Sequence, residues 1–232
     1  MKTTIVTIAL LGTESTGKTQ LSSAMATALA AQGHAAVVVP EWLRTWCDRE
    51  GRTPWPDEQL AIAQTQAAQV DEAVRRLRCQ ASTRPAYVIA DTSSLMTAIY
   101  SDWLFGDPSL YPMALAHQRA FDHTLVTGLD LPWIADGLQR DGPQVREPID
   151  TLLRAKLAEG GVPYKVIYGV GEERVGNAMS AIGTSLLPEA PQNVSGWTWS
   201  CDKCSDPACE HRLFSRLLQE CSPSPEEGRP MG

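Results

Sequence analysis

The sequence predicts an α/β protein in which helices cover both faces of a parallel sheet. Short, almost continuously apolar runs such as 4–11 and 35–39 alternate with longer helical segments. Strands that are buried on both faces have continuous apolar runs, and strands that alternate with helices form parallel sheets. A glycine-rich turn joins the first apolar run to an alanine-rich segment, which is a strand-to-helix connection found in this class of protein.

Five apolar runs are predicted as strands. The first three read TIVTIALL, AAVVV and AYVIA, and Pro40 closes the second of them. Two further runs, PWIA and YKVIY, complete the set. In chain order the predicted strands cover residues 4–11, 35–39, 86–90, 132–135 and 164–168.

Helices are predicted between these strands. The alanine-rich segment 20–31 is followed by Gly33, and glycine is common just after a helix. The segment 57–80 has Asp57 and Glu58 in its first turn and arginines in its last turn, which complements the helix dipole. The remaining helices are predicted at residues 94–103, 112–127, 147–159 and 172–185, with a short one at 212–220.

Composition excludes several classes of protein. Of the 232 residues, 43% are hydrophobic, and 20 Lys and Arg against 27 Asp and Glu give a net charge of −7. The apolar fraction is too high for a disordered chain, and the negative charge argues against nucleic-acid binding. No apolar run approaches the roughly 20 residues that a membrane-spanning helix needs. We therefore expect a globular protein that binds neither nucleic acid nor a membrane.

The six cysteines are distributed unevenly, since Cys47 and Cys79 stand alone while the other four lie near the C-terminus. A disulfide framework is usually spread through a small secreted chain, so we expect a cytoplasmic protein with reduced thiols. The predicted organisation is a main α/β domain at 1–187, a Pro-containing linker at 188–196, a zinc-knuckle-like segment at 197–221 and a disordered tail at 222–232.

The glycine-rich turn matches the Walker A, or P-loop, pattern G-x-x-x-x-G-K-S/T in its proper context, after a strand and before a helix. Consecutive backbone N–H groups of such a loop converge on phosphate oxygens, and the helix N-terminus adds its positive end. Lys18 would contact the β- and γ-phosphates, and the Thr19 hydroxyl would bind Mg²⁺. The sequence therefore predicts binding of ATP by Gly12, Thr13, Glu14, Ser15, Thr16, Gly17, Lys18 and Thr19.

A carboxylate follows three of the predicted strands: Glu41, Asp91 and Asp136. The carboxyl ends of parallel strands meet at one edge of the sheet, where ligands of open α/β folds bind. We expect Asp91 to serve Mg²⁺ or to act as a base, Glu41 to act as a base or to anchor a substrate hydroxyl, and Asp136 to contact substrate. The alternative for each is a helix N-cap or an acid in a surface turn.

Two arginines follow Asp136 in the segment DGLQRDGPQVR, which precedes a predicted helix. Arg140 and Arg146 are interpreted as catalytic residues of a mobile lid that brings positive charge onto the transferring phosphoryl group. The alternative is an ordinary solvated loop.

These motifs, in this order, resemble the NadR-type kinases, the ATP-binding ribosylnicotinamide kinase half of bacterial NAD-salvage proteins. The resemblance covers about residues 3–185 and rests on GTESTGKT at 12–19, PEWLR at 40–44, Asp91-Thr92 with Thr97 and Tyr100, Asp136-Gly137 with Arg140, and GEER at 171–174. With the P-loop beginning at residue 12, the resemblance is to the kinase half alone.

The resemblance implies a nucleoside-kinase-like P-loop fold that uses ATP and Mg²⁺. The reaction it implies is transfer of the γ-phosphoryl group to the 5′-hydroxyl of nicotinamide riboside. It places Glu41 and Arg44 at the substrate and Arg174 near the adenine.

Four aromatic residues, Tyr100, Trp103, Phe105 and Tyr111, follow the third predicted strand. An acceptor base or a cationic ring would stack on such a group, and Tyr100 is predicted to bind substrate. The alternative is packing in the core, which we also expect of Trp42 and Trp46.

Four zinc-type ligands lie within eleven residues near the C-terminus: Cys201, Cys204, Cys209 and His211. They predict a closed, structural Zn²⁺ site, because tetrahedral zinc takes four such groups. Cys221 is an alternative fourth ligand, and free or redox-active thiols or a disulfide are alternative states. This segment is expected to pack on the main domain or to bind a partner protein.

Two functions are consistent with the sequence. The leading one is a kinase that phosphorylates a small nucleoside. The alternative is a regulatory P-loop ATPase that acts as a nucleotide-dependent switch through the C-terminal zinc segment.

Overall fold

Five parallel strands form one sheet in the computed structural model, which describes residues 3–80, 82–134 and 142–184. Their order across the sheet is β2-β3-β1-β4-β5, and every neighbouring pair is parallel. The predicted α/β class is therefore confirmed. The strands are β1 (Ile5–Leu11), β2 (Ala35–Val39), β3 (Ala86–Asp91), β4 (His123–Thr127) and β5 (Lys165–Ile167).

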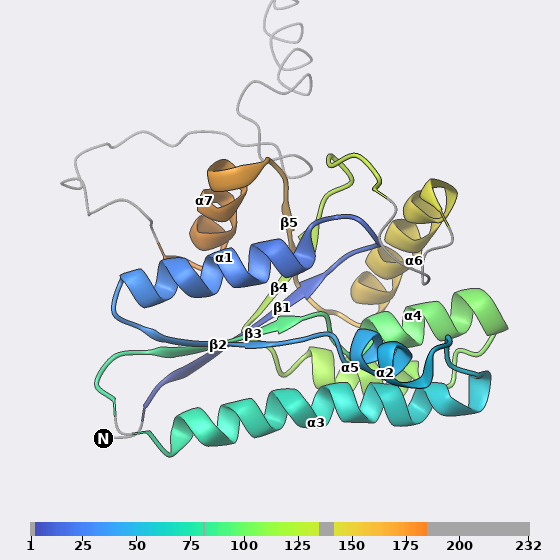
Figure 1. Ribbon diagram of the computed structural model, residues 1–232, viewed down its shortest axis with the longest axis horizontal. Coiled ribbons are helices and arrows are strands. Elements are labelled where there is room, and N and C mark those ends of the chain that lie inside the picture. The colour runs from blue at the N-terminus through green and yellow to red at the C-terminus, as the bar shows by residue number, and fades with distance from the viewer. Residues whose placement is uncertain (1–2, 81, 135–141, 185–232) are drawn as a thin grey trace, which may run out of the picture. The chain divides into compact units, whose positions relative to one another are not determined.

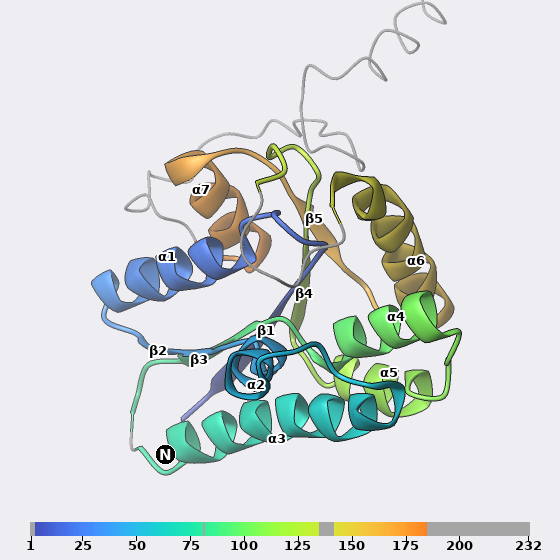
Figure 2. The same ribbon diagram turned by 45° about the vertical axis from the view of Figure 1, so that its right-hand side comes forward.

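Helices cover both faces of the sheet, as Figures 1 and 2 show. Side chains alternate along each strand, so Ile8 and Leu10 of β1 pack on one side with α1 and α7. Ala9 and Leu11 face the other side and pack with α4, α5 and α6. The helices are α1 (Lys18–Ala31), α2 (Trp42–Glu50), α3 (Gln59–Arg78), α4 (Ser94–Phe105), α5 (Tyr111–Gln118), α6 (Arg146–Glu159) and α7 (Gly171–Ala181), with 3-10 turns at Pro56–Glu58 and Pro143–Val145.

The fourth strand does not lie where the sequence predicts it. The predicted helix 112–127 ends as α5 at Gln118, and its last five residues form β4 instead. Residues 132–134 belong to no strand. The physical reason is burial between two neighbours, since β4 pairs with β1 and β5 and its Leu125 and Val126 are fully buried. The helix α2 was also not predicted.

The turn between α2 and α3 is stabilised by Arg52. Its guanidinium lies 4.9 Å and 5.3 Å from the ring centroids of Trp46 and Trp55. The same guanidinium makes two hydrogen bonds of 2.7 Å to the carboxylate of Glu58. These bonds, with a further one from the Trp55 backbone N–H, lower the pKa of Glu58 from 4.5 to about 2.

No helix within the described ranges is both long and apolar enough to cross a membrane. The predicted linker 188–196, the zinc-knuckle-like segment 197–221, its helix at 212–220 and the tail 222–232 lie outside the described residues.

Candidate functional site

The P-loop follows β1 and opens α1, as predicted. Gly12 and Gly17 have positive φ angles of 145° and 73°, and Ser15 has one of 53°. A Cβ atom at Gly12 would lie 2.1 Å from Thr127 Oγ1 of β4. Glycine is therefore required at residue 12 both by the backbone and by the neighbouring strand.

Hydrogen bonds inside the P-loop fix its shape. The Thr16 hydroxyl donates to the Thr13 carbonyl at 2.8 Å, and Thr127 Oγ1 lies 2.7 Å from Thr16 Oγ1. The Lys18 ammonium donates to the carbonyls of Gly12 and Thr13 at 3.0 Å and 2.8 Å. The positive charge of Lys18 is thus held against the loop backbone, where it is placed to interact with a phosphate.

Arg174 supports the P-loop from α7. Arg174 is only 4% exposed, and its Nη2 donates to the Thr16 carbonyl at 2.9 Å. Its Nη1 donates to the Gly169 carbonyl at 3.0 Å and lies 3.5 Å from the carboxylate of Asp130. The resemblance placed this arginine near the adenine. In the structure its guanidinium contacts the backbone that carries the phosphate loop.

Asp91 is the last residue of β3 and faces the start of α1. Tyr87 and Ile89, on the same face of β3, pack with α1, and side chains two residues apart share a face. Asp91 is only 3% exposed, and its Oδ1 has no hydrogen-bond partner among the described residues. A buried carboxylate oxygen in this state is costly unless a ligand completes it.

Asp91 and Thr19 fit the chemistry of a magnesium site. Mg²⁺ prefers oxygen ligands and is usually held by one or two protein groups together with phosphate oxygens and water. In the part of the chain that the structure describes, no group of three or more His, Cys, Asp or Glu side chains gathers as a metal site of its own. The ion would therefore depend on the nucleotide for its other ligands.

Glu41 directly precedes α2 at the carboxyl end of β2. Its side chain makes no N-cap hydrogen bond to the helix, so the alternative of a simple helix cap is not what the structure shows. Its carboxylate lies 3.5 Å from Arg44 Nη2. The Trp42 N–H donates instead to the side chain of Gln66 at 2.7 Å, which fixes the start of α2. The Glu41 carboxylate is partly exposed, and within the described ranges it is ion-paired with Arg44.

Arg146 is the first residue of α6 and is almost completely buried, at 8% exposed. Its Nη1 donates to the Leu131 carbonyl at 2.9 Å. Its Nε and Nη2 have no hydrogen-bond partner, and no carboxylate pairs with it among the described residues. The sequence predicted a mobile lid arginine, and in the structure this side chain is buried and bonded to the Leu131 carbonyl.

The loop after β4 connects Arg146 to the P-loop. The Ser15 hydroxyl donates to the Ile134 carbonyl at 2.6 Å. A Cβ atom at Gly17 would lie 3.0 Å from the Leu131 side chain, so the loop lies directly on the P-loop. Arg146 donates to Leu131 of the same loop, so its guanidinium is bonded to the loop that contacts the P-loop.

The acid nearest the end of β4 is Asp130, which the sequence analysis missed because it placed the strand too late. Asp130 accepts a hydrogen bond of 2.7 Å from the Gly169 N–H and so joins the loops after β4 and β5. The strand predicted before Asp136 is not formed at residues 132–134. Asp136 and Arg140 both lie outside the described residues.

The aromatic residues after β3 do not form one face. Tyr111 is buried and donates a 2.8 Å hydrogen bond to Asp102, so core packing is its role. Tyr100 is partly buried against the same core, while Trp103 and Phe105 are exposed. Trp46 packs with α3, as predicted.

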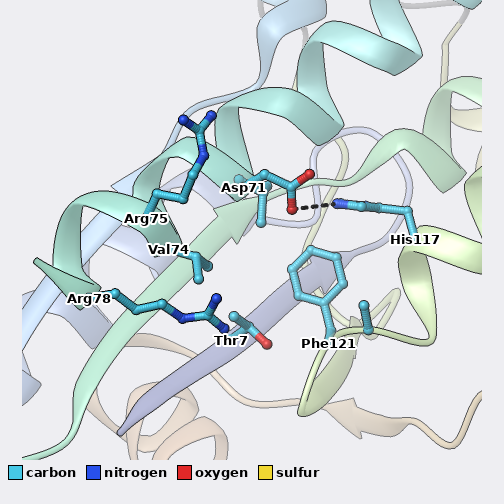
Figure 3. A pocket seen from close by; sticks show the side chains of 9 residues that line it. Thr7, Asp71, Val74, Arg75, Arg78, His117 and Phe121 are labelled. Atoms are coloured by element: carbon cyan, nitrogen blue, oxygen red, sulfur yellow. Dashed lines mark ion pairs between the residues drawn. The ribbon is translucent and has the colours of Figure 1, made fainter. Parts of the chain in front are cut away.

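A hollow of about 390 Å³ lies elsewhere on the molecule, between α3 and the end of α5 (Figure 3). Its wall includes Thr7, which precedes the P-loop by five residues along β1, so the hollow is separate from the nucleotide site. Asp71 and His117 face each other across it, with 3.8 Å between Oδ1 and Nε2. Burial lowers the pKa of His117, which favours its neutral form.

Residues 7–174 match the model of a protein family described as AAA domain (AAA_28). No protein of known, curated function matches the chain.

Among solved structures, a NadR protein in complex with NAD and AMP-PNP is similar to this chain, with a TM-score of 0.58 and 19% identity over 81% of this chain and 52% of that one. A NadR protein in complex with NR has a TM-score of 0.57 and 15% identity over the same shares. The chain thus spans about half the length of the NadR chains. A deoxyadenosine kinase from M. mycoides with bound dATP has a TM-score of 0.48 and 12% identity, over 77% of this chain and 100% of that one. The NadR structures confirm the predicted P-loop kinase fold.

Proposed function

The chain belongs to the AAA_28 family of AAA domains, and from that premise we propose that it is a kinase. The proposed reaction transfers the γ-phosphoryl group of ATP to a hydroxyl of a nucleoside. The chain is a P-loop nucleotide-binding domain with the fold of kinases. Beyond the fold, the kinase proposal rests on three groups: the buried cation Arg146, the carboxylate of Asp91 for Mg²⁺ and the carboxylate of Glu41 for the acceptor.

The observation that carries this proposal is the buried guanidinium of Arg146. A guanidinium keeps its charge, and a buried charge without a partner costs several kcal/mol. The guanidinium is bonded to the loop that contacts the P-loop, and we assign its two unpartnered donors to the terminal phosphate of ATP, which would bring negative charge. A guanidinium at this place stabilises the charge that develops on a transferring phosphoryl group.

Each remaining residue has one role in the proposed reaction. Lys18 and the P-loop N–H groups bind the phosphates, and Thr19 and Asp91 would hold Mg²⁺, which supplies further neutralising charge. Glu41 accepts the proton of the acceptor hydroxyl, and Arg44 orients that carboxylate. The acceptor oxygen forms a bond to the γ-phosphorus as the bond to the β,γ-bridging oxygen breaks, and ADP leaves. Arg140 and Asp136 are kept in the proposal on the strength of the sequence alone.

The acceptor we propose is nicotinamide riboside. The support is the ordered set of motifs that resembles the NadR-type kinases, together with the similarity to a NadR structure in complex with NR. Tyr100, half-buried on α4, is the aromatic residue we propose to contact the acceptor base.

The test is ADP formation by the purified protein with Mg²⁺-ATP, alone and with nicotinamide riboside, adenosine, cytidine or uridine. We expect strong stimulation by nicotinamide riboside and none in Lys18→Ala. Glu41→Gln should lose phosphoryl transfer while its affinity for ATP stays within about twofold. Stimulation by another nucleoside would keep the reaction and change the acceptor. Slow turnover that ignores every nucleoside would favour the nucleotide switch.

For the segment 197–221 we propose a structural Zn²⁺ bound by Cys201, Cys204, Cys209 and His211, within a cytoplasmic protein. The support is the ligand pattern, because a segment this short has too small a core to fold without a staple. Purified full-length protein should contain one zinc per chain and release it to a chelator. Protein without zinc, and with accessible thiols or a disulfide among these cysteines, would contradict the proposal. If the segment binds a partner protein, binding should be lost when a chelator removes the zinc.

A further inference from the structure

The peptide after β3 is strained at Thr92. Its φ angle is +85°, and among the described residues only Thr92 and Ser15 of the P-loop combine a side chain with a positive φ. This conformation is costly for a β-branched residue, and such strain persists where the surrounding structure enforces it, most often at functional sites. Both strained residues lie at the carboxyl edge of the sheet.

Fixed elements on either side hold Thr92 in this conformation. Its N–H donates to the Leu10 carbonyl at 3.1 Å and so extends the pairing of β3 with β1. The next residue, Ser93, caps α4 by accepting from the Leu95 N–H at 3.2 Å, and its hydroxyl donates to Gln118 at 2.6 Å. The chain therefore turns from strand to helix within two residues, Thr92 and Ser93.

Glycine would adopt this backbone without strain, so the backbone alone does not account for a threonine here. The hydroxyl does not account for it either through protein contacts. Thr92 is 5% exposed, and its Oγ1 has no hydrogen-bond partner among the described residues. The same is true of Ser94 Oγ, two residues further on at the start of α4. Unpartnered buried hydroxyls destabilise a protein unless a ligand completes them.

We propose that Thr92 and Ser94 form a subsite that hydrogen-bonds hydroxyl groups of the acceptor sugar. A hydroxyl both donates and accepts, so two of them match a diol such as that of ribose. The class of ligand that fits two such hydroxyls is a neutral, hydroxyl-bearing sugar. This subsite rests on the proposed function, because it lies beside Asp91 at the edge that holds the P-loop.

The test compares Thr92→Val, Thr92→Ser and Ser101→Ala in the full chain. Valine keeps the branched shape and the strain but removes the hydroxyl, and serine keeps the hydroxyl. Ser101 is the matched control, because its hydroxyl is also buried and unpartnered but lies seven residues further along α4. Nicotinamide riboside, adenosine and adenosine lacking the 2′- or 3′-hydroxyl serve as probes, in calorimetric titrations and in ADP formation.

We expect Thr92→Val to melt no lower than the wild-type protein, to bind ATP within twofold, and to raise both Kd and KM for the ribosyl probe at least tenfold. Thr92→Ser and Ser101→Ala should bind that probe within threefold of wild type. The probe that lacks the contacted hydroxyl should bind wild type and Thr92→Val equally.

Three results would overturn the subsite: an unchanged Kd in Thr92→Val, a lowered melting temperature with equal losses for ATP and acceptor, or no binding of any ribosyl probe to wild type. Turnover with an unchanged acceptor KM in Thr92→Val would leave the proposed kinase function standing. Hydroxyl-dependent binding of a probe without any phosphoryl transfer would support the subsite and contradict the proposed kinase function.

Discussion

Replacement of Arg146 by Met should make the protein more stable and less able to recognise a triphosphate. Methionine is unbranched and of similar length, so it fills the space of the buried side chain without its charge. The change removes one hydrogen bond, from Nη1 to the Leu131 carbonyl at 2.9 Å. It also removes a guanidinium that has two unpartnered nitrogens and no carboxylate partner among the described residues.

The magnitude follows from these opposing terms. A hydrogen bond from a charged donor contributes about 1.5–3 kcal/mol. Burial of an unpaired cation costs several kcal/mol, and each unsatisfied donor adds about 1–3 kcal/mol. The burial cost that is removed exceeds the hydrogen bond that is lost, so we expect Arg146→Met to raise the free energy of unfolding by about 2 kcal/mol. For a chain of this length that is a rise of about 4–8 °C in Tm.

The assay is thermal unfolding without nucleotide, with Mg²⁺-ADP and with Mg²⁺-AMP-PNP. A ligand at 100 times its Kd stabilises by about 2.7 kcal/mol. Wild type should gain more from AMP-PNP than from ADP, and Arg146→Met should lose that difference. The control is Arg154→Met on the same helix, because Arg154 is ion-paired to Asp150 at 2.6 Å. The control should keep the nucleotide response. A lower Tm for Arg146→Met, with the AMP-PNP response intact, would refute the reasoning.

Three other changes test the support of the site. Arg174→Met should destabilise by about 3–5 kcal/mol in urea, because Thr16 and Gly169 lose their buried donor; a weaker ATP affinity at unchanged stability would place Arg174 on the nucleotide instead. Gly12→Ala should abolish binding of a fluorescent ATP, since its Cβ would lie 2.1 Å from a Thr127 atom; normal affinity would contradict the packing. Glu58 has a lowered pKa of about 2, so its stabilising pair is complete above pH 4.5 and is lost as the pH falls towards 2. Glu58→Gln should therefore flatten the fall in stability between these pH values, and equal slopes in both proteins would argue against it.

The local part of the site was predictable from the sequence. The P-loop is a contiguous motif between a strand and a helix, so its residues and its fold are specified together. Asp91 was predictable for the same reason, because the buried strand that precedes it is unambiguous. Both depend on signals within about ten residues.

The fourth strand was not predictable with the same rule. The apolar residues of 112–118 continue into those of 123–127, and helical spacing fits the combined segment. The distinguishing signal was the β-branched run HTLVT before Gly128. That signal favours a strand over a helix only when the segment is known to lie between β1 and β5, where both of its faces are buried. Tertiary burial therefore overrode the local pattern.

The hydrogen-bond partners of the buried arginines could not be predicted from local sequence patterns. Arg174 binds the carbonyl of Thr16, which lies 158 residues earlier in the chain. The sequence predicted a role for Arg146 from the segment DGLQRDGPQVR, and the family resemblance implied one for Arg174. Only the structure shows that the Arg174 guanidinium donates to the carbonyls of Thr16 and Gly169, whereas, among the described residues, that of Arg146 donates to the Leu131 carbonyl alone.

Several energetically costly features of the described residues lie at one edge of the sheet. Strained residues, an unpaired buried cation and unpartnered buried oxygens each destabilise a fold, and each would be relieved by one substitution. Ser15, Asp91, Thr92 and Arg146 bear these costs, and all lie in segments that follow the carboxyl ends of strands or contact the P-loop. Away from this edge the described residues include Ser101 Oγ and His117 Nδ1 as unpartnered buried atoms, but no strained residue with a side chain and no buried cation that lacks a carboxylate. Local departures from stable packing are expected where a protein prepares a site for a ligand, so their shared location argues for the phosphate-transfer site independently of the motif.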